Sequence, residues 1–234
     1  MFHPARSLFV LLAVLASASA ACAAGLKEDM VALDQASIPA LSILNRDEPE
    51  LARHAMDTLT RRWRGFRAQY AQMRPSDAQW QADFKRIDDL IADANRIVGS
   101  GKERPAAREA LKNVRRVLLE IREREKMPYY LDHLTRFHDV MEDMFLLVRD
   151  KTAETLTEAE VAKIRAAYAT ADRLWAVAAA AKVDPEFGLD AARQGELSKS
   201  IAKESQALAS LGRALEGADK GALIKAVQGI RGPF

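Results

Sequence analysis

Apolar residues recur along most of the chain at spacings of three and four, the period of a helix with one buried face. This pattern predicts helices at residues 47–74, 76–99, 102–126, 128–148, 157–183, 190–216 and 219–230. A weaker pattern at residues 26–44 contains Pro39 and predicts a kinked or two-piece helix. Glycine and proline are few, and alanine, leucine and the helix-favouring charged residues are common. We therefore predict an all-α fold, built as an antiparallel helical bundle or bundles.

The expected helix ends have recognisable turn chemistry. Gly99 is predicted to close the second of these helices, and Pro128 to break the chain before the fourth. Three tetrapeptides match the pattern of an N-terminal capping box: residues 47–50, 76–79 and 157–160. The buried face of the first helix after residue 47 is predicted to consist of Leu51, Ala55, Leu59, Trp63, Phe66 and Tyr70.

The order of helices is similar in the two halves of the chain. Each half begins with a long helix that contains aromatic residues and continues with two amphipathic helices, and the polar segment 149–158 lies between them. We predict an N-terminal helical unit at residues 25–150 and a C-terminal unit at residues 151–234. Two alternatives remain open: the units are tandem related copies, or they pack together as one domain.

The first 24 residues predict an exported protein. Arg6 precedes an apolar run and then small residues, as in a secretory signal peptide, and the run is shorter than the roughly 20 residues that span a bilayer. We expect the mature protein in the periplasm, with no transmembrane span. Cys22 follows small residues as in a lipoprotein attachment site, although Ser19 stands where a large aliphatic residue is usual. Lipidation of Cys22, and a lipid anchor to the envelope, is therefore the alternative.

Composition excludes several classes of function. With 35 basic and 33 acidic residues, the chain lacks the basic excess of a nucleic-acid-binding protein. Because Cys22 is the only cysteine, a disulfide framework, a thiolate metal site and a covalently attached c-type haem are excluded. Arg61, Arg62 and Arg64 flank Trp63, and we predict that the tryptophan is buried while the arginines are solvated.

One segment, residues 128–144, concentrates residue types that bind metals and cofactors, including two of the four histidines. His138 and Glu142 lie one helical turn apart at the border of the apolar face, so both side chains can reach one ion. We identify them as candidate metal ligands and expect His138 to be partly buried. A non-covalent haem, with Met30 or Met56 as the second axial ligand, is a further possibility.

Three neighbours of this pair complete the candidate ligand site. Met141 lies on the apolar face, where methionine is an ordinary core residue as well as a soft ligand. Tyr129 and Tyr130 follow the break at Pro128, where aromatic side chains can line a pocket.

No catalytic motif occurs in the sequence, so we expect a non-enzymatic protein. Two hypotheses of function remain. In the first, the protein is a periplasmic helical bundle that binds a metal ion, haem or a small ligand near residues 128–144. In the second, it is an accessory or scaffold protein that binds another envelope protein through its helical faces and holds no cofactor.

Overall fold

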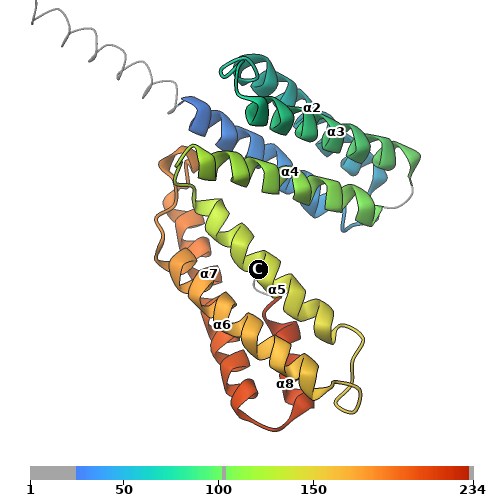
Figure 1. Cartoon of the computed structure of the whole chain (residues 1–234), viewed down its shortest axis with the longest axis vertical. Coiled ribbons are helices and arrows are strands. Elements are labelled where there is room, and N and C mark those ends of the chain that lie inside the picture. The colour runs from blue at the N-terminus through green and yellow to red at the C-terminus, as the bar shows by residue number, and fades with distance from the viewer. Residues whose placement is uncertain (1–24, 102–103, 232–234) are drawn as a thin grey trace, which may run out of the picture. The chain divides into compact units, whose positions relative to one another are not determined.

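The structure is a computed structural model and describes residues 25–101 and 104–231. These residues form helices and no strand, so the prediction of an all-α fold is confirmed (Figure 1). The described elements are a helix at residues 25–43, α2 (Pro49–Tyr70), α3 (Ala78–Ser100), α4 (Arg104–Arg124), α5 (Tyr130–Val148), α6 (Glu158–Ala180), the 3-10 helix η1 (Pro185–Phe187), α7 (Ala191–Glu216) and α8 (Lys220–Gly229).

The chain divides into two compact units, one ending at Pro128 and one beginning at Tyr129. The sequence pattern instead placed a division near residue 150, at a polar segment. That segment connects α5 to α6, which pack on each other: the rings of Phe137 and Trp175 have centroids 4.9 Å apart. Because α5 is held by α6, it lies in the second unit. The structure does not decide whether the two units are related copies.

The N-terminal unit has an aromatic core. Phe84 of α3 is 2 % exposed, and its ring lies against rings of α2 and α3 at centroid distances of 5.1 to 5.9 Å. The predicted face of α2 is buried from Leu59 onward, but Leu51 is 52 % exposed. Leu51 lies in the first turn of the helix. The buried residues at this end are Ala52 and Met56, each one position after the predicted Leu51 and Ala55. The buried residues of α2 are Ala52, Met56, Leu59, Trp63, Phe66 and Tyr70.

The C-terminal unit has a core of smaller and more aliphatic side chains. Its buried residues come from α5, α6, α7 and α8, and both methionines of α5 are among them. On α7 the buried residues include an acid among leucines: Glu204 is 1 % exposed. The buried α7 residues are Glu204, Leu208, Leu211 and Leu215.

The structure confirms one of the predicted helix caps and corrects the others. The capping box at Thr157 is confirmed, with both reciprocal hydrogen bonds present. At α2 the box is wrong, because Pro49 fixes the first helical position and leaves Asp47 one residue too early to cap. The cap of α3 is Asp77, which accepts from two backbone N–H groups. The same helix ends at Gly101, which has a positive φ of 70°, and not at Gly99.

The helix at residues 25–43 continues through Pro39 as one element, so the prediction of two pieces is wrong, while the alternative of a kinked helix stays a prediction. None of the helices within residues 25–101 and 104–231 has the length and apolarity needed to cross a membrane. The predicted signal peptide, residues 1–24, and the candidate lipidation site Cys22 lie outside the described residues.

Candidate functional site

Three of the candidate residues near α5 lie in the protein core. Tyr129, Tyr130 and Met141 are 2 %, 4 % and 1 % exposed, respectively. The backbone N–H of Tyr130 donates to Oδ2 of Asp184 at 2.7 Å, and the ring of Tyr129 lies 5.8 Å from that of Phe187. These contacts join the start of α5 to the connection between α6 and α7. The two tyrosines therefore pack against protein at the site where a ligand pocket was predicted.

The hydroxyl group of Tyr130 is buried and forms no hydrogen bond with the described part of the chain. Burial also raises the pKa of Tyr130 above its ordinary value of 10.0. A buried hydroxyl without a partner destabilises a fold, since the group loses its hydrogen bonds to water. Tyr130 is therefore held in place by its ring and its backbone, and not by its hydroxyl.

The candidate metal ligands lie at the edge of the second core. His138 is partly buried, as predicted. The carboxylate of Glu142 is largely buried, and its Oε2 lies 3.8 Å from Nε of Arg231, beyond hydrogen-bonding distance. The guanidinium group of Arg231 also lies over the ring of Phe145, 4.3 Å from its centroid. Glu142 thus faces a positive charge that the protein itself supplies, the guanidinium group of Arg231.

A metal site needs more donors than this pair supplies. Within the described ranges, no group of three or more His, Cys, Asp or Glu side chains is arranged to hold a metal ion. Structural zinc sites use four protein ligands and catalytic zinc sites use three. Metal binding by His138 and Glu142 stays a prediction, and it requires further donor atoms that these two side chains do not supply.

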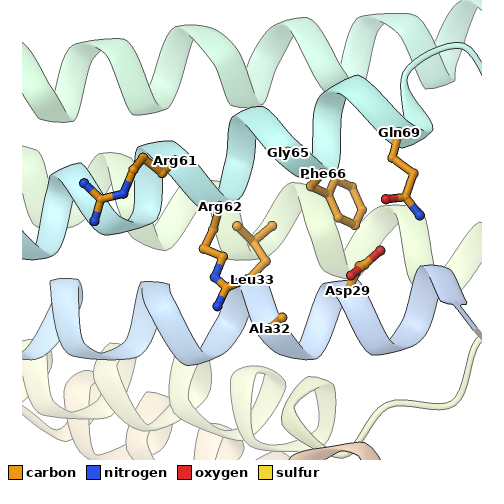
Figure 2. A pocket seen from close by; sticks show the side chains of 8 residues that line it. All are labelled: Asp29, Ala32, Leu33, Arg61, Arg62, Gly65, Phe66 and Gln69. Carbon is orange, nitrogen blue, oxygen red and sulfur yellow. The ribbon is translucent and has the colours of Figure 1, made fainter.

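The N-terminal unit contains a cleft that the sequence did not predict. It lies between the helix at residues 25–43 and α2 and has a volume of about 150 Å³. Figure 2 shows side chains from both helices directed into it. The lining residues are Asp29, Ala32, Leu33, Arg61, Arg62, Gly65, Phe66 and Gln69.

One end of the cleft is anionic and has fixed geometry. Oδ2 of Asp29 accepts a hydrogen bond of 2.6 Å from the hydroxyl of Tyr70. The side-chain amide of Gln69 in turn donates to the oxygen of that hydroxyl at 2.9 Å. Tyr70 is 3 % exposed, so a buried aromatic residue orients both polar groups at the surface. The carboxylate of Asp29 keeps acceptor capacity, because an ionised carboxylate can accept several hydrogen bonds.

The other end of the cleft is cationic. Arg62 forms no ion pair or hydrogen bond with any described residue, and its side chain extends toward Ala32 on the neighbouring helix (Figure 2). Arg61 beside it donates to the hydroxyl of Thr58 at 3.0 Å. Both arginines are exposed, as predicted, and Trp63 between them and Arg64 is buried. An unpaired guanidinium beside a fixed carboxylate can bind a ligand that carries both an acidic and a basic group.

Gly65 keeps the middle of the cleft open. It lies inside α2, where glycine is less favourable than alanine by about 1 kcal/mol. A Cβ atom placed on Gly65 would meet no other atom within 4 Å, so packing does not require glycine there. A larger residue at this position would project into the space between Arg62 and Gln69. A glycine inside a helix, without a packing reason, is a signal by which the sequence could have pointed to the cleft.

A second cleft, of about 170 Å³, lies in the C-terminal unit beside the turn from α7 to α8. Its cations are already occupied. Lys220 contacts Glu158 at 2.7 Å and donates to the carbonyl of Leu156 at 2.8 Å, while Arg165 donates to the carbonyl of Leu215 at 2.8 Å. These contacts close helix ends and loops, so the second cleft offers no comparable free cation.

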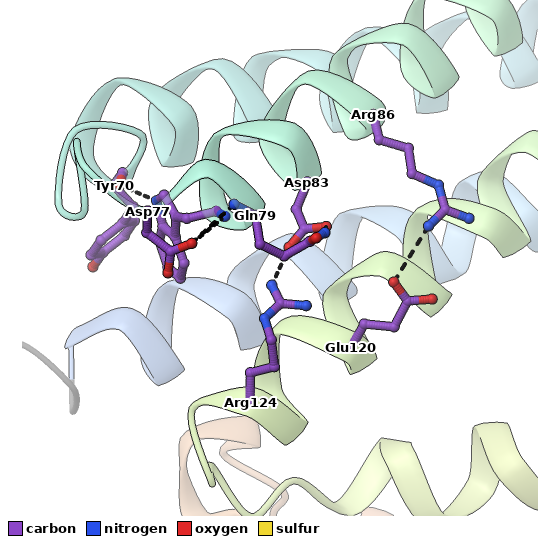
Figure 3. A network of polar contacts seen from close by, with 8 residues as sticks. Tyr70, Asp77, Gln79, Asp83, Arg86, Glu120 and Arg124 are labelled. Carbon is purple, nitrogen blue, oxygen red and sulfur yellow. Dashed lines mark hydrogen bonds and ion pairs between the residues drawn. The ribbon is translucent and has the colours of Figure 1, made fainter.

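A polar network on the far side of α3 has a structural role (Figure 3). Asp83 is 1 % exposed and accepts from Nε2 of Gln79 at 2.8 Å and from the guanidinium of Arg124. Arg86 of α3 lies 3.4 Å from the carboxylate of Glu120 on α4. Each acid has a partner within the unit, so the network joins α3 to α4 and leaves no group for a ligand.

Known proteins provide no further evidence on the function of these clefts. Comparison of the chain with protein-family models, with curated proteins and with solved structures finds no match.

Proposed function

We propose that the chain is an exported, non-enzymatic helical protein that binds a small ligand, and that the ligand occupies the cleft between residues 25–43 and α2. The observation that carries the proposal is the unpaired guanidinium of Arg62, in one cleft with the carboxylate of Asp29. In residues 128–144, where the sequence placed the ligand, Tyr129, Tyr130 and Met141 are core side chains.

The charges of the cleft indicate a ligand class. Arg62 suits a carboxylate or another small anion, since guanidinium groups bind such groups through paired hydrogen bonds. Asp29, oriented by Tyr70, suits an ammonium group or a hydroxyl. A small zwitterion, such as a free amino acid, satisfies both ends at once.

The size of the cleft agrees with such a ligand. Its volume of about 150 Å³ is smaller than the roughly 300–1,000 Å³ of sites for drug-sized molecules. A molecule of few heavy atoms therefore suits this cleft better than one of the size of haem.

The test is a titration of the 15N-labelled mature protein with each of the free amino acids, followed by amide chemical shifts. We expect shifts confined to residues 25–43 and α2. Arg62→Ala and Asp29→Asn should each weaken binding at least about tenfold, which corresponds to about 1.4 kcal/mol for a lost charged contact. Arg64→Ala is the matched control, because Arg64 is exposed on the same helix but does not line the cleft.

A second pair of variants tests the space and not the charge. Gly65→Leu should abolish the shifts by filling the cleft while leaving the fold intact. Gly99→Leu is its control, because Gly99 also lies in a helix with open space around its Cβ position. Equal weakening by Arg64→Ala and Arg62→Ala, or no shifts with any amino acid, would overturn the proposal.

The alternative function, binding of another envelope protein through the helical faces, predicts a different result. No free amino acid would then shift these amides, and Gly65→Leu would leave the partner bound. Metal binding by His138 and Glu142 is tested in parallel by titrating Zn²⁺ and Cu²⁺ into the wild-type protein and into His138→Ala.

A further inference from the structure

We propose that Glu204 makes the C-terminal unit sensitive to pH, with a closed α6–α7 interface when its carboxyl group is protonated and a loosened interface when it is ionised. This proposal is independent of the ligand cleft, which lies in the other unit.

Glu204 occupies a position that the helix otherwise gives to aliphatic side chains. The residues three or four positions away on the same face are Ile201 and Leu208, and Leu211 and Leu215 continue that face. Glu204 is more deeply buried than Ile201, which is only partly buried. A glutamate that replaces a core leucine must be satisfied by partners or remain neutral.

The described residues provide no hydrogen-bonding partner for the carboxyl group of Glu204. Neither carboxylate oxygen of Glu204 accepts a hydrogen bond, and no ion pair within the described chain reaches it. The neighbouring residue Ser205 accepts from Nε1 of Trp175 at 2.9 Å, so the indole of α6 is directed to Ser205 and not to the glutamate. Trp175 itself packs on Phe137 of α5. Glu204 thus lies on the buried face of α7 together with leucines, next to a residue that contacts an aromatic side chain.

Several charged groups of the surrounding helices are engaged elsewhere. Arg231, after α8, pairs with Glu142 of α5. On α6, Arg165 donates to the carbonyl of Leu215, and on α7, Lys199 pairs with Glu196. Within the described residues, no cation forms a hydrogen bond with the carboxylate of Glu204.

Burial alone raises the pKa of Glu204 from 4.5 to about 7. The group therefore changes charge near neutral pH. When α7 separates from α6 and Glu204 meets water, its pKa returns toward 4.5. Between pH 4.5 and 7 the closed form keeps its proton while the open form loses it, so opening becomes more favourable as the pH rises. Above pH 7 both forms are ionised and the effect reaches its limit.

Most residues of α7 between 191 and 203 are exposed, so the part of the helix that precedes Glu204 buries few side chains. Closer to the end of α7, the hydroxyl of Tyr168 approaches Gly212 so closely that a Cβ atom there would lie 2.5 Å from it. The helices are thus close at Gly212, and loosening is expected on the N-terminal side of that contact.

Hydrogen exchange of the whole mature protein, measured by mass spectrometry from pH 4.5 to 8, tests the proposal. After correction for the pH dependence of intrinsic exchange, the opening of the α6 and α7 segments around Trp175 and Glu204 should increase toward tenfold per pH unit within the window. The total increase by pH 8 should be about 300-fold, which is the factor for a pKa change of 2.5. Segments of α2 and α3 should not share this profile.

Glu204→Gln removes the charge and keeps the shape, so it should abolish the pH-dependent part of the opening. Glu204→Leu should do the same and protect the segment more strongly at pH 8. Glu196→Gln is the control, because Glu196 lies on the same helix with a side chain that is 73 % exposed. Coincident pH profiles of the wild type and Glu204→Gln would overturn the proposal. Failure of both Glu204 variants to fold would also overturn it, since neutral residues are expected to stabilise this unit.

Discussion

One buried acid from each unit, Asp83 and Glu204, shows two opposite environments. Asp83 in the N-terminal unit has two partners on two helices, while Glu204 in the C-terminal unit has none. Both side chains are 1 % exposed. Equal burial therefore has opposite consequences: the paired acid holds α3 and α4 together, and the unpaired acid opposes the packing of its helix at neutral pH.

The buried tyrosines repeat this difference. The hydroxyl of Tyr70 donates to Asp29 and accepts from Gln69, while that of Tyr130 has no hydrogen-bond partner within the described residues. The N-terminal unit also has the larger aromatic core. We infer that the N-terminal unit provides a rigid scaffold for its cleft, and that the C-terminal unit is the one whose packing responds to conditions.

The largest expected effect comes from the aromatic core. Phe84→Ala removes the ring that contacts Trp63, Phe66 and Trp80, and should destabilise the N-terminal unit by about 3–5 kcal/mol. Hydrogen exchange should show lost protection in α2 to α4, with α6 and α7 unchanged. Equal loss of protection in both units would contradict their description as separately packed bodies.

An effect of intermediate size should distinguish the two buried acids, because substitutions at Asp83 and Glu204 should change stability in opposite directions. Asp83→Asn replaces the charge that Arg124 contacts and should destabilise the N-terminal unit by about 2 kcal/mol at pH 7.5. Glu204→Gln should stabilise the C-terminal unit at the same pH. The check is urea denaturation monitored by exchange in each unit, with Asp93→Asn as an exposed control for Asp83. If both substitutions destabilise, the contrast between the acids is wrong.

The smallest effect concerns the tyrosine hydroxyls. Tyr70→Phe should destabilise the protein by about 1 kcal/mol, because it breaks the contact to Asp29. Tyr130→Phe should leave stability unchanged or raise it slightly, since no hydrogen bond is lost. Thermal unfolding of the two variants under one set of conditions measures the difference. A larger loss for Tyr130→Phe would show that its hydroxyl has a partner in solution.

Local interactions made much of the architecture predictable. The spacing of apolar residues located the described helices, and Thr157 with Glu160 formed the expected capping box. Such features depend on residues within four positions of one another, so they can be read directly from the chain. The same reasoning placed Trp63 in the core and His138 at its edge.

The candidate sites could not be predicted from neighbouring residues in the sequence alone. Residues 128–144 attracted attention because histidines and methionines are rare and chemically distinctive, but Met141 and both tyrosines are core residues here. The cleft is formed by residues from two helices, and Asp29 is opposite Gln69 only because those helices pack side by side. Gly65 lies inside a helix without an evident packing reason, but Gly99 and Gly195 do so too, and the glycine alone does not identify a cleft.

The sequence by itself determined the helical elements and most of their buried faces, because helix period and cap chemistry are short-range. Tertiary structure decided that α5 belongs with α6, that Asp83 is paired and Glu204 is not, and that Asp29 and Arg62 share a cleft. These outcomes depend on which helix packs against which, a choice made by contacts between residues distant in the chain. A glutamate in a row of leucines looks the same in the sequence whether or not another helix supplies its partner.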